Sequence, residues 1–340
     1  MRKKYFLYEL KANMTRTIVL TIFASAINVV TILNELNMTY STLARDLVGI
    51  PMFILAILSI FIPIMNFSFT KSRRSVDEFY SLPISKVNLM FVKGGASVVD
   101  VVIPYTISFF FGFLIVLLSS SGLYMGYYLL FFAISLLIGL SITFYIIFLY
   151  IQGNTILDGL IIIGMGVLVF VAVTGAILQP LNSELSPFIF TPFYSYVHLT
   201  NLFSSLIYDA SFNINSNYYD VLKEIIEPII GHSFTFLLGG VSVLLLYFQT
   251  KKNKAELAED LSTSWFGYKT MIPIFMIGLL TMVHDSGEII LYVIIVILAI
   301  VMTMIEYRSV KLTWKTWGRL GIYLLASIVL SFLLSFFVTL

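Results

Sequence analysis

Cysteine is absent from this chain of 340 residues. Its absence excludes disulfide bonds, thiol nucleophiles and cysteine metal ligands, whichever compartment the chain occupies. Histidine is scarce as well, because only His198, His232 and His284 occur, in separate segments without the spacing of a ligand pair. We therefore expect scattered histidines and no metal site on this chain.

Motifs for nucleotide binding and hydrolysis are also missing. The chain has no Gly-x-x-x-x-Gly-Lys-Ser/Thr loop, whose backbone N–H groups would cradle a triphosphate. No Ser-His-Asp or paired-carboxylate arrangement can be argued from the spacing of its residues. We expect no catalytic residue and no cofactor on this chain, which is therefore not itself an enzyme.

Charged residues are rare, and apolar residues dominate. Only 11% of the residues are charged and 59% are hydrophobic, whereas an average soluble domain has roughly 25% charged residues. Nine apolar stretches are near the roughly 20 residues that span a bilayer as a helix. They are residues 17–33, 47–67, 96–118, 127–151, 160–178, 229–248, 266–283, 289–305 and 320–340. The pattern predicts an all-α polytopic membrane protein with about nine transmembrane helices.

The distribution of basic residues predicts the orientation of these helices. If the N-terminus is cytoplasmic, all of the twenty Lys and Arg residues except Arg45 and Lys223 fall on the cytoplasmic side. Basic flanks resist translocation, so this asymmetry supports a cytoplasmic N-terminus and an outer C-terminus. The expected location is the cell membrane, as a multi-pass protein of the bacterial cytoplasmic membrane, with the lipid bilayer as a partner and no nucleic acid.

Two regions follow from this topology. Residues 1–250 form a six-helix core, with a cytoplasmic loop at 68–94 and an outer segment at 179–228. The outer segment is rich in aromatic residues and proline. Residues 251–340 form a cytoplasmic linker and a three-helix extension. The outer segment is expected on or in the outer leaflet, ending in an amphipathic helix at 218–226.

Residues 266–305 either span twice or form a re-entrant hairpin. We prefer spanning, because a re-entrant turn would place Asp285 and Glu288 at membrane depth.

The cytoplasmic loop contains the most informative motif, Arg-Ser-Val-Asp-Glu-Phe-Tyr-Ser-Leu-Pro-Ile-Ser-Lys at residues 74–86. Ser75 and Glu78 have capping-box spacing, and Asp77 adds negative charge at the expected start of a helix. Pro83 should end that helix after about two turns, and Ser85 should cap the next helix, which runs into the third span. The loop therefore predicts a short helix with an apolar side, which either binds a partner or dips into the lipid headgroups.

This loop resembles a known family. Arg-Ser-x-Asp followed by Leu-Pro-Ile-Ser-Lys, between the second and third spans, is similar to the permease subunits of type 2 ATP-binding-cassette exporters of Gram-positive bacteria. A second match is Lys-Asn-Lys-Ala-Glu-Leu-Ala at residues 252–258, similar to longer relatives with extra C-terminal spans. The resemblance covers about residues 1–270. The outer segment at 179–228 departs from the family, because the simplest members have a compact re-entrant pair there.

The resemblance implies a function. In that family this loop forms a coupling helix that docks on a dimer of a separate cytosolic ATPase, which carries ATP and Mg, beside a second permease subunit that is identical or related. The implied docking residues are Ser75, Asp77, Glu78, Phe79, Tyr80, Leu82 and Pro83. The chain would then be a permease that exports an amphipathic or hydrophobic substrate, such as a peptide, an antibiotic or a lipid-like compound.

Other polar and small residues in the spans leave alternatives open. Asp100 is the one acidic residue inside a predicted span, and it belongs either to a substrate path or, as we prefer, to packing near the cytoplasmic interface. Ser108 and Gly112 have the four-residue spacing of close helix contacts, which we assign to packing within one subunit. The alternative functions are an ion-gradient-driven secondary transporter or channel, and a non-catalytic membrane scaffold or sensor.

Overall fold

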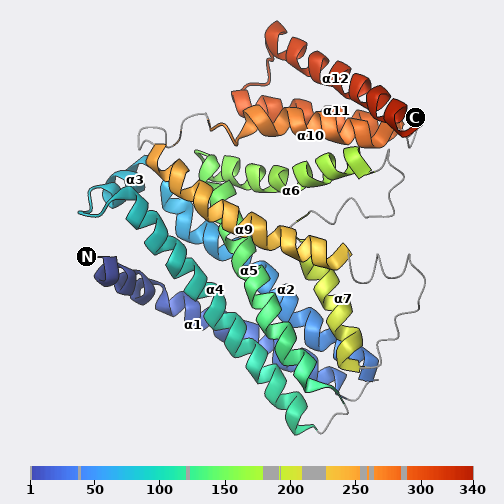
Figure 1. Ribbon diagram of the computed structural model, residues 1–340. Coiled ribbons are helices and arrows are strands. Elements are labelled where there is room, and N and C mark those ends of the chain that lie inside the picture. Colours follow the sequence, from blue (N-terminus) through green and yellow to red (C-terminus); the bar gives the residue numbers. More distant parts are fainter. Residues whose placement is uncertain are drawn as a thin grey trace. The chain divides into compact units, whose positions relative to one another are not determined.

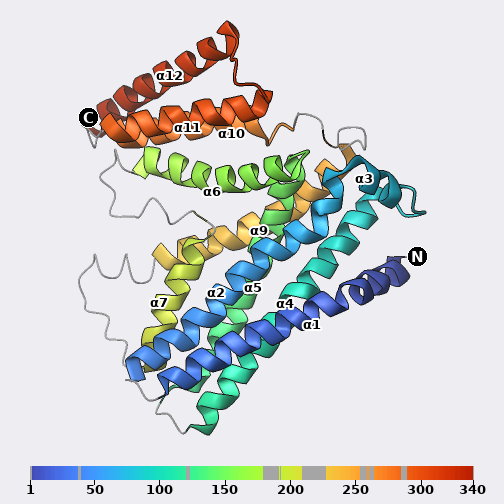
Figure 2. The ribbon, with the colours of Figure 1, turned by 180° about the vertical axis from the view of Figure 1, so that it is seen from behind.

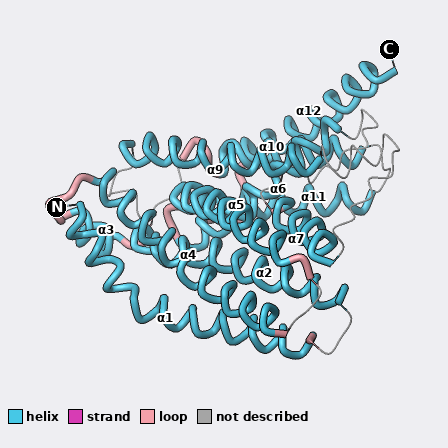
Figure 3. Tube along the Cα trace, turned by 60° about the horizontal axis from the view of Figure 1, so that its bottom comes forward, coloured by secondary structure: helices cyan, strands magenta, loops and turns pink. Residues whose placement is uncertain are grey.

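A computed structural model describes residues 2–36, 40–119, 123–178, 191, 193–208, 227–252, 259, 264–284 and 289–339. The regular structure of these described residues is helical throughout, and no strand occurs among them (Figure 3). The predicted all-α class is therefore confirmed for the part of the chain that the structure describes. The predicted helix at 218–226 and most of the second family motif, residues 253–258, lie outside the described residues.

The helices follow the apolar stretches of the sequence (Figure 1). Their bounds are α1 (Arg2–Glu35), α2 (Tyr40–Phe67), a short 3-10 helix η1 (Ser68–Lys71), α3 (Arg73–Tyr80), α4 (Lys86–Leu118), α5 (Met125–Gln152), α6 (Ile156–Leu178), α7 (Tyr194–Tyr208), α9 (Glu227–Lys252), α10 (Tyr268–His284), α11 (Ile289–Tyr307) and α12 (Trp314–Thr339).

Eight of these helices are long and apolar enough to cross a membrane: α1, α2, α4, α5, α6, α9, α11 and α12. The chain is thus a multi-pass membrane protein, as predicted. The count of about nine spans needs a correction at residues 266–283, where α10 has only 17 residues and contains Pro273. At about 1.5 Å per residue such a helix reaches about 25 Å, less than the roughly 30 Å of a hydrocarbon core. Whether α10 spans or is part of a re-entrant hairpin stays a prediction.

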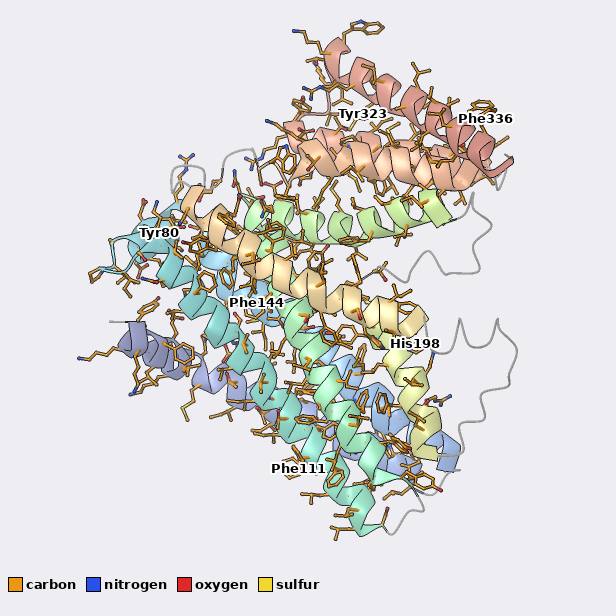
Figure 4. All side chains as sticks on the ribbon, in the orientation of Figure 1. Tyr80, Phe111, Phe144, His198, Tyr323 and Phe336 are labelled. Carbon is orange, nitrogen blue, oxygen red and sulfur yellow. The ribbon has the colours of Figure 1, made fainter. Side chains whose placement is uncertain are left out.

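The surfaces of these helices are consistent with lipid as their solvent. Large apolar side chains are exposed along most of them, including Ile22 (64%), Phe61 (58%) and Leu237 (64%). Phe111 on α4 and Phe336 on α12, which are labelled in Figure 4, are also half exposed or more. A soluble protein rarely exposes apolar patches on this scale, whereas a bilayer accommodates them.

Two helices differ from the sequence prediction. The first span was expected from residue 17, but α1 begins at Arg2, so the basic N-terminal residues belong to the same continuous helix. The outer segment at 179–228 was expected on or in the outer leaflet, and the only helix predicted in it was the one at 218–226. The structure places the 15-residue α7 within it. The rest of that segment, apart from residues 191, 193, 227 and 228, lies outside the described part of the chain.

Close contacts divide the chain into two compact units. The first comprises Met1–Ser68, Glu78–Phe148 and Pro192–Asn253, and the second comprises Phe69–Asp77, Leu149–Thr191 and Lys254–Leu340. The second unit thus joins α6 to the three C-terminal helices. The sequence suggested a different division, at residue 250, between a functional six-helix core and a C-terminal extension. That functional division stays a prediction.

In the first unit, small residues let α4 pack closely on α1. A Cβ atom at Gly112 would lie 2.7 Å from the side chains of both Asn28 and Ile32. The Asn28 amide donates a 2.7 Å hydrogen bond to the Ser108 carbonyl oxygen, and the Ser108 hydroxyl donates a 3.0 Å bond to the Ala24 carbonyl oxygen. The prediction that Ser108 and Gly112 serve packing within one subunit is confirmed.

Aromatic rings join α4 to α5 in the same unit. The rings of Phe109 and Tyr128 stack with centroids 4.2 Å apart, and both side chains are fully buried. Deeper along the same helices, the hydroxyl groups of Tyr105 and Ser135 form a 2.5 Å hydrogen bond. This hydrogen bond satisfies two buried hydroxyl groups that have no access to water.

The second unit is organised around α10, which packs against α6, α11 and α12 (Figure 2). A Cβ atom at Gly278 would lie 2.8 Å from the backbone of Ala172, so α10 and α6 meet almost backbone to backbone. The apolar core of the C-terminal helices consists of Phe275, Met276, Leu280, Val283, Ile295, Ala299 and Leu320.

Candidate functional site

The short helix α3 connects the long helices α2 and α4, as the loop motif predicted. Its start differs, because the Val76 N–H donates to the Ser72 carbonyl oxygen at 2.9 Å and the helix begins at Arg73. Ser75 therefore lies within the first turn and does not cap it, so the expected capping box with Glu78 is wrong. The predicted cap of the next helix is confirmed, since the Ser85 side chain accepts a hydrogen bond from the Asn88 N–H.

The charges of α3 are unfavourable for the helix itself. Its first turn contains Arg73 and Arg74 and no acidic residue, while Asp77 and Glu78 lie in its second half. A helix dipole favours the opposite arrangement, with acids at the N-terminus and bases at the C-terminus. The acidic residues therefore do not support the helix through its dipole, as the sequence suggested; each instead follows an arginine by four residues, Asp77 after Arg73 and Glu78 after Arg74.

Packing holds one side of α3. Val76 is buried, with 3% of its surface exposed. The Lys93 ammonium lies 4.2 Å from the centre of the Phe79 ring, and the Lys86 ammonium lies 4.7 Å from the centre of the Tyr80 ring, which Figure 4 labels. Burial raises the pKa of the Tyr80 phenol, so its hydroxyl stays protonated at neutral pH. These cation–π contacts fix α3 to the start of α4.

The implied docking residues therefore fall into two groups. Asp77, Glu78 and Pro83 are exposed, whereas Ser75, Phe79, Tyr80 and Leu82 are partly buried. After Tyr80 the chain turns, and the Ser81 hydroxyl donates to the Glu78 carbonyl oxygen at 2.8 Å. The exposed side of α3 thus presents two carboxylates beside two guanidinium groups, and its apolar side is already occupied by the chain itself.

A buried polar network surrounds Asp100, which is 1% exposed. The carboxylate receives hydrogen bonds from Arg16 (2.6 Å), Thr17 (2.8 Å), Asn13 (3.0 Å) and Asn66 (3.2 Å). These donors lie on α1 and α2, and Asp100 lies on α4. An ionised carboxylate in a membrane span needs such compensation, because its desolvation is costly.

A second buried ion pair lies on the same helices. The Lys93 ammonium is 3.1 Å from the Glu9 carboxylate, which also accepts a 2.5 Å hydrogen bond from the Tyr5 hydroxyl. The Ser97 hydroxyl links this pair to Asp100, because it donates to the Lys93 carbonyl oxygen and accepts from the Asn66 amide. Polar contacts therefore run without a gap from Asp100 to Lys93, the residue that covers the Phe79 ring of α3.

Asp100 also borders an opening. A largely apolar groove of about 420 Å³ lies between α1 and α4 and is lined by Met14, Ile18, Ile103 and Asp100, among others. The preferred packing role of Asp100 agrees with its four hydrogen bonds. A role in a substrate path stays a prediction.

Two histidines that the sequence placed in separate segments meet in the structure. The rings of His198 on α7 and His232 on α9 have centroids 5.7 Å apart. The Ser195 hydroxyl lies 3.0 Å from His232 Nδ1 and 2.9 Å from the Thr235 hydroxyl. Burial lowers the pKa of the His198 imidazole, which keeps it neutral. No group of three potential metal ligands occurs among the described residues, and the side chain of His284 is not among them.

The second unit contains a polar cluster that sequence reasoning missed. The Asp158 carboxylate accepts a 3.0 Å hydrogen bond from the Tyr268 hydroxyl and lies 3.6 Å from the Arg308 guanidinium. The Lys71 ammonium donates to the carbonyl oxygens of Tyr150 and Gly153 at 2.6 and 2.5 Å. Asp158 stood at the edge of an apolar stretch, so its sequence position gave no sign of these partners.

Comparison of the chain with known proteins identified no related protein. No protein-family model, curated protein or solved structure matches the chain. The family resemblance therefore depends on the loop motif at 74–86, the motif at 252–258 and the order of the apolar stretches.

Proposed function

We propose that the protein is the membrane-spanning permease subunit of an ATP-binding-cassette exporter, with α3 as its coupling helix. A separate cytosolic ATPase dimer would bind ATP and Mg, and a second permease subunit, identical or related, would complete the complex in a bacterial cytoplasmic membrane. The exported substrate would be amphipathic or hydrophobic, such as a peptide, an antibiotic or a lipid-like compound.

The observation that supports this proposal best is the two-sided character of α3. One side is held to the chain through Val76 and Phe79, so the helix cannot move freely. The other side exposes Asp77 and Glu78 in the second half of the helix, where the helix dipole disfavours acidic residues. Residues that break a local rule are typical of functional sites. A groove on a partner protein would explain these residues.

The contacts beyond α3 suggest how a movement there would reach the spans. Lys93 contacts Phe79 through its ammonium and pairs with Glu9 on α1. Through Ser97 and Asn66 the same network continues to Asp100. A push on α3 would therefore act on α1, α2 and α4 together, which fits a coupling role in which closure of the ATPases tilts the spans.

The ion-gradient alternative has less support. It needs an ionisable group in a span that can take up and release an ion, whereas Asp100, Glu9 and Lys93 each have an oppositely charged partner within 3.1 Å. Such pairs are expected of a packed network rather than of an open ion site. A non-catalytic scaffold would use the same helices but would need no motor protein at α3.

The absence of cysteine allows a direct test of the partner. In native membranes a single Asp77→Cys variant can be labelled with a thiol-reactive, photo-activated cross-linker. Because the chain has no other thiol, every adduct recovered with the purified chain is attached at residue 77. We expect a cross-linked protein that contains a phosphate-loop motif when its peptides are sequenced. Lys315→Cys, an exposed position in the second unit, serves as the control and should not give this product. Cross-links from Asp77→Cys to lipid alone, or to proteins without such a motif, would contradict the proposal.

A further inference from the structure

A polar cavity lies between the C-terminal helices α10, α11 and α12 of the second unit. Its volume is about 270 Å³, enough for a phosphate group with its attached atoms. Its lining includes Lys269 at the start of α10, Glu306 and Tyr307 at the end of α11, and Arg319 on α12. The lining also includes Tyr268 and Leu320, which are 2% and 6% exposed.

The cavity has a net positive lining. Lys269 and Arg319 are exposed and line the cavity together with Glu306, so two basic side chains accompany one acidic side chain. The Arg319 guanidinium donates a 2.8 Å hydrogen bond to the Tyr307 hydroxyl. Because Tyr307 accepts this bond, its own O–H remains able to donate to a ligand. The cavity therefore offers two cations and a hydroxyl donor to an anion.

The tryptophan positions indicate that this cavity lies at the level of the lipid headgroups. All three tryptophans of the chain are near it in sequence: Trp265 precedes α10, and Trp314 and Trp317 are at the start of α12. They are 73%, 89% and 46% exposed. Exposed tryptophan side chains favour the interface between hydrocarbon and water. The basic distribution predicts this interface to be the cytoplasmic one.

We propose that this cavity binds a phosphate group, presented by the headgroup of an anionic phospholipid or by a soluble phosphate compound. Arginine binds phosphate through several N–H donors, and basic cavities between spanning helices at the cytoplasmic face suit anionic headgroups. The tryptophans favour the lipid source, whose acyl chains would lie along exposed apolar residues of α12 such as Ile322 and Leu325.

Tryptophan fluorescence tests the lipid source, because all three tryptophans of the chain lie within three residues of a residue that lines the cavity. The purified full chain is titrated with brominated phosphatidylglycerol and, separately, with brominated phosphatidylcholine. We expect quenching at a lower mole fraction of phosphatidylglycerol. Arg319→Gln should reduce this preference about fivefold, as about 1 kcal/mol per basic side chain at an anionic surface implies. Lys269→Gln, on a different helix, should do the same.

The control is Lys311→Gln, which removes an exposed charge outside the cavity lining and should keep the preference. Inorganic phosphate and glycerol phosphate test the soluble source, through an increase in melting temperature that Arg319→Gln abolishes. A preference for phosphatidylglycerol that both cavity variants lose supports the site and identifies a lipid ligand. An increase in melting temperature with soluble phosphate that both variants lose supports the site and identifies a soluble ligand. Equal quenching by the two lipids without soluble protection, or equal loss in Lys311→Gln, overturns it. No ATPase is involved, so the outcome is independent of the proposed export function.

Discussion

The guanidinium of Arg16 on α1 lies 2.6 Å from the carboxylate of Asp100 on α4, and the carboxylate side chain is only 2% exposed. The pair joins two helices that are also joined by the Asn28 bond to Ser108 farther along. A buried charge of this kind is costly to leave alone, and removing one partner commonly destabilises a protein by about 3–5 kcal/mol.

We therefore expect Asp100→Asn to lower thermal stability strongly, because Arg16 loses its counter-charge. The measurement is helix melting followed by circular dichroism in detergent. The double variant Arg16→Gln with Asp100→Asn should recover much of the loss, since no unpaired charge then remains.

Asp46 supplies the matched control for this pair. It lies 3.5 Å from Arg45, whose side chain is 69% exposed, and such exposed pairs contribute at most about 1 kcal/mol. Asp46→Asn should change the melting temperature little. If Asp100→Asn melts like Asp46→Asn, the buried network does not hold α1 to α4.

The close approach of α6 and α10 gives a steric prediction. Gly278→Ala would place a methyl group 2.8 Å from the backbone of Ala172, which cannot move without shifting α6. Overpacking of this kind costs about 1–3 kcal/mol. Tryptophan fluorescence on heating should report the loss, because all three tryptophans lie in the second unit.

Gly321→Ala is the control on α12, where a Cβ atom has no neighbour within 4 Å. Alanine is a better helix former than glycine by about 1 kcal/mol, so this variant should be neutral or slightly stabilised. Equal melting of the two variants would mean that α6 and α10 are not in backbone contact.

The membrane orientation can be tested with single cysteines in this cysteine-free chain. Arg45→Cys, at an exposed position predicted outside, should react with a membrane-impermeant maleimide on intact cells. Arg74→Cys, at an exposed position predicted inside, should react only after the cells are permeabilised. The reverse pattern would invert the topology and would place α3 where no cytosolic ATPase could reach it.

The sequence predicts the fold of this protein better than its site. Apolar stretches of about 20 residues locate eight of the long helices because the hydrocarbon core sets their length. The cap at Ser85 was readable because it depends on residues three positions apart. The start of α3 was not, since Ser75 and Glu78 have the spacing of a capping box, whereas in the structure the Val76 N–H bonds to the Ser72 carbonyl oxygen.

Contacts between distant segments could not be read at all. Asp100 attracted attention as an acid in a span, but its partners Arg16 and Asn66 lie 84 and 34 residues away. His198 and His232 meet only because α7 packs on α9, and α7 itself was hidden in a segment whose aromatic residues suggested a membrane surface. Such contacts depend on tertiary packing, which periodicity does not encode.

Co-purified ATPase activity tests the central claim most directly. The full chain is isolated from its native membrane in mild detergent. ATP hydrolysis is measured for the wild type and for the double variant Asp77→Ala with Glu78→Ala, which removes two exposed carboxylates and introduces a good helix former. We expect activity with the wild type and its loss with the double variant, while both proteins melt at the same temperature. Equal ATPase activity in both preparations, or none in either, would contradict a motor protein bound at α3.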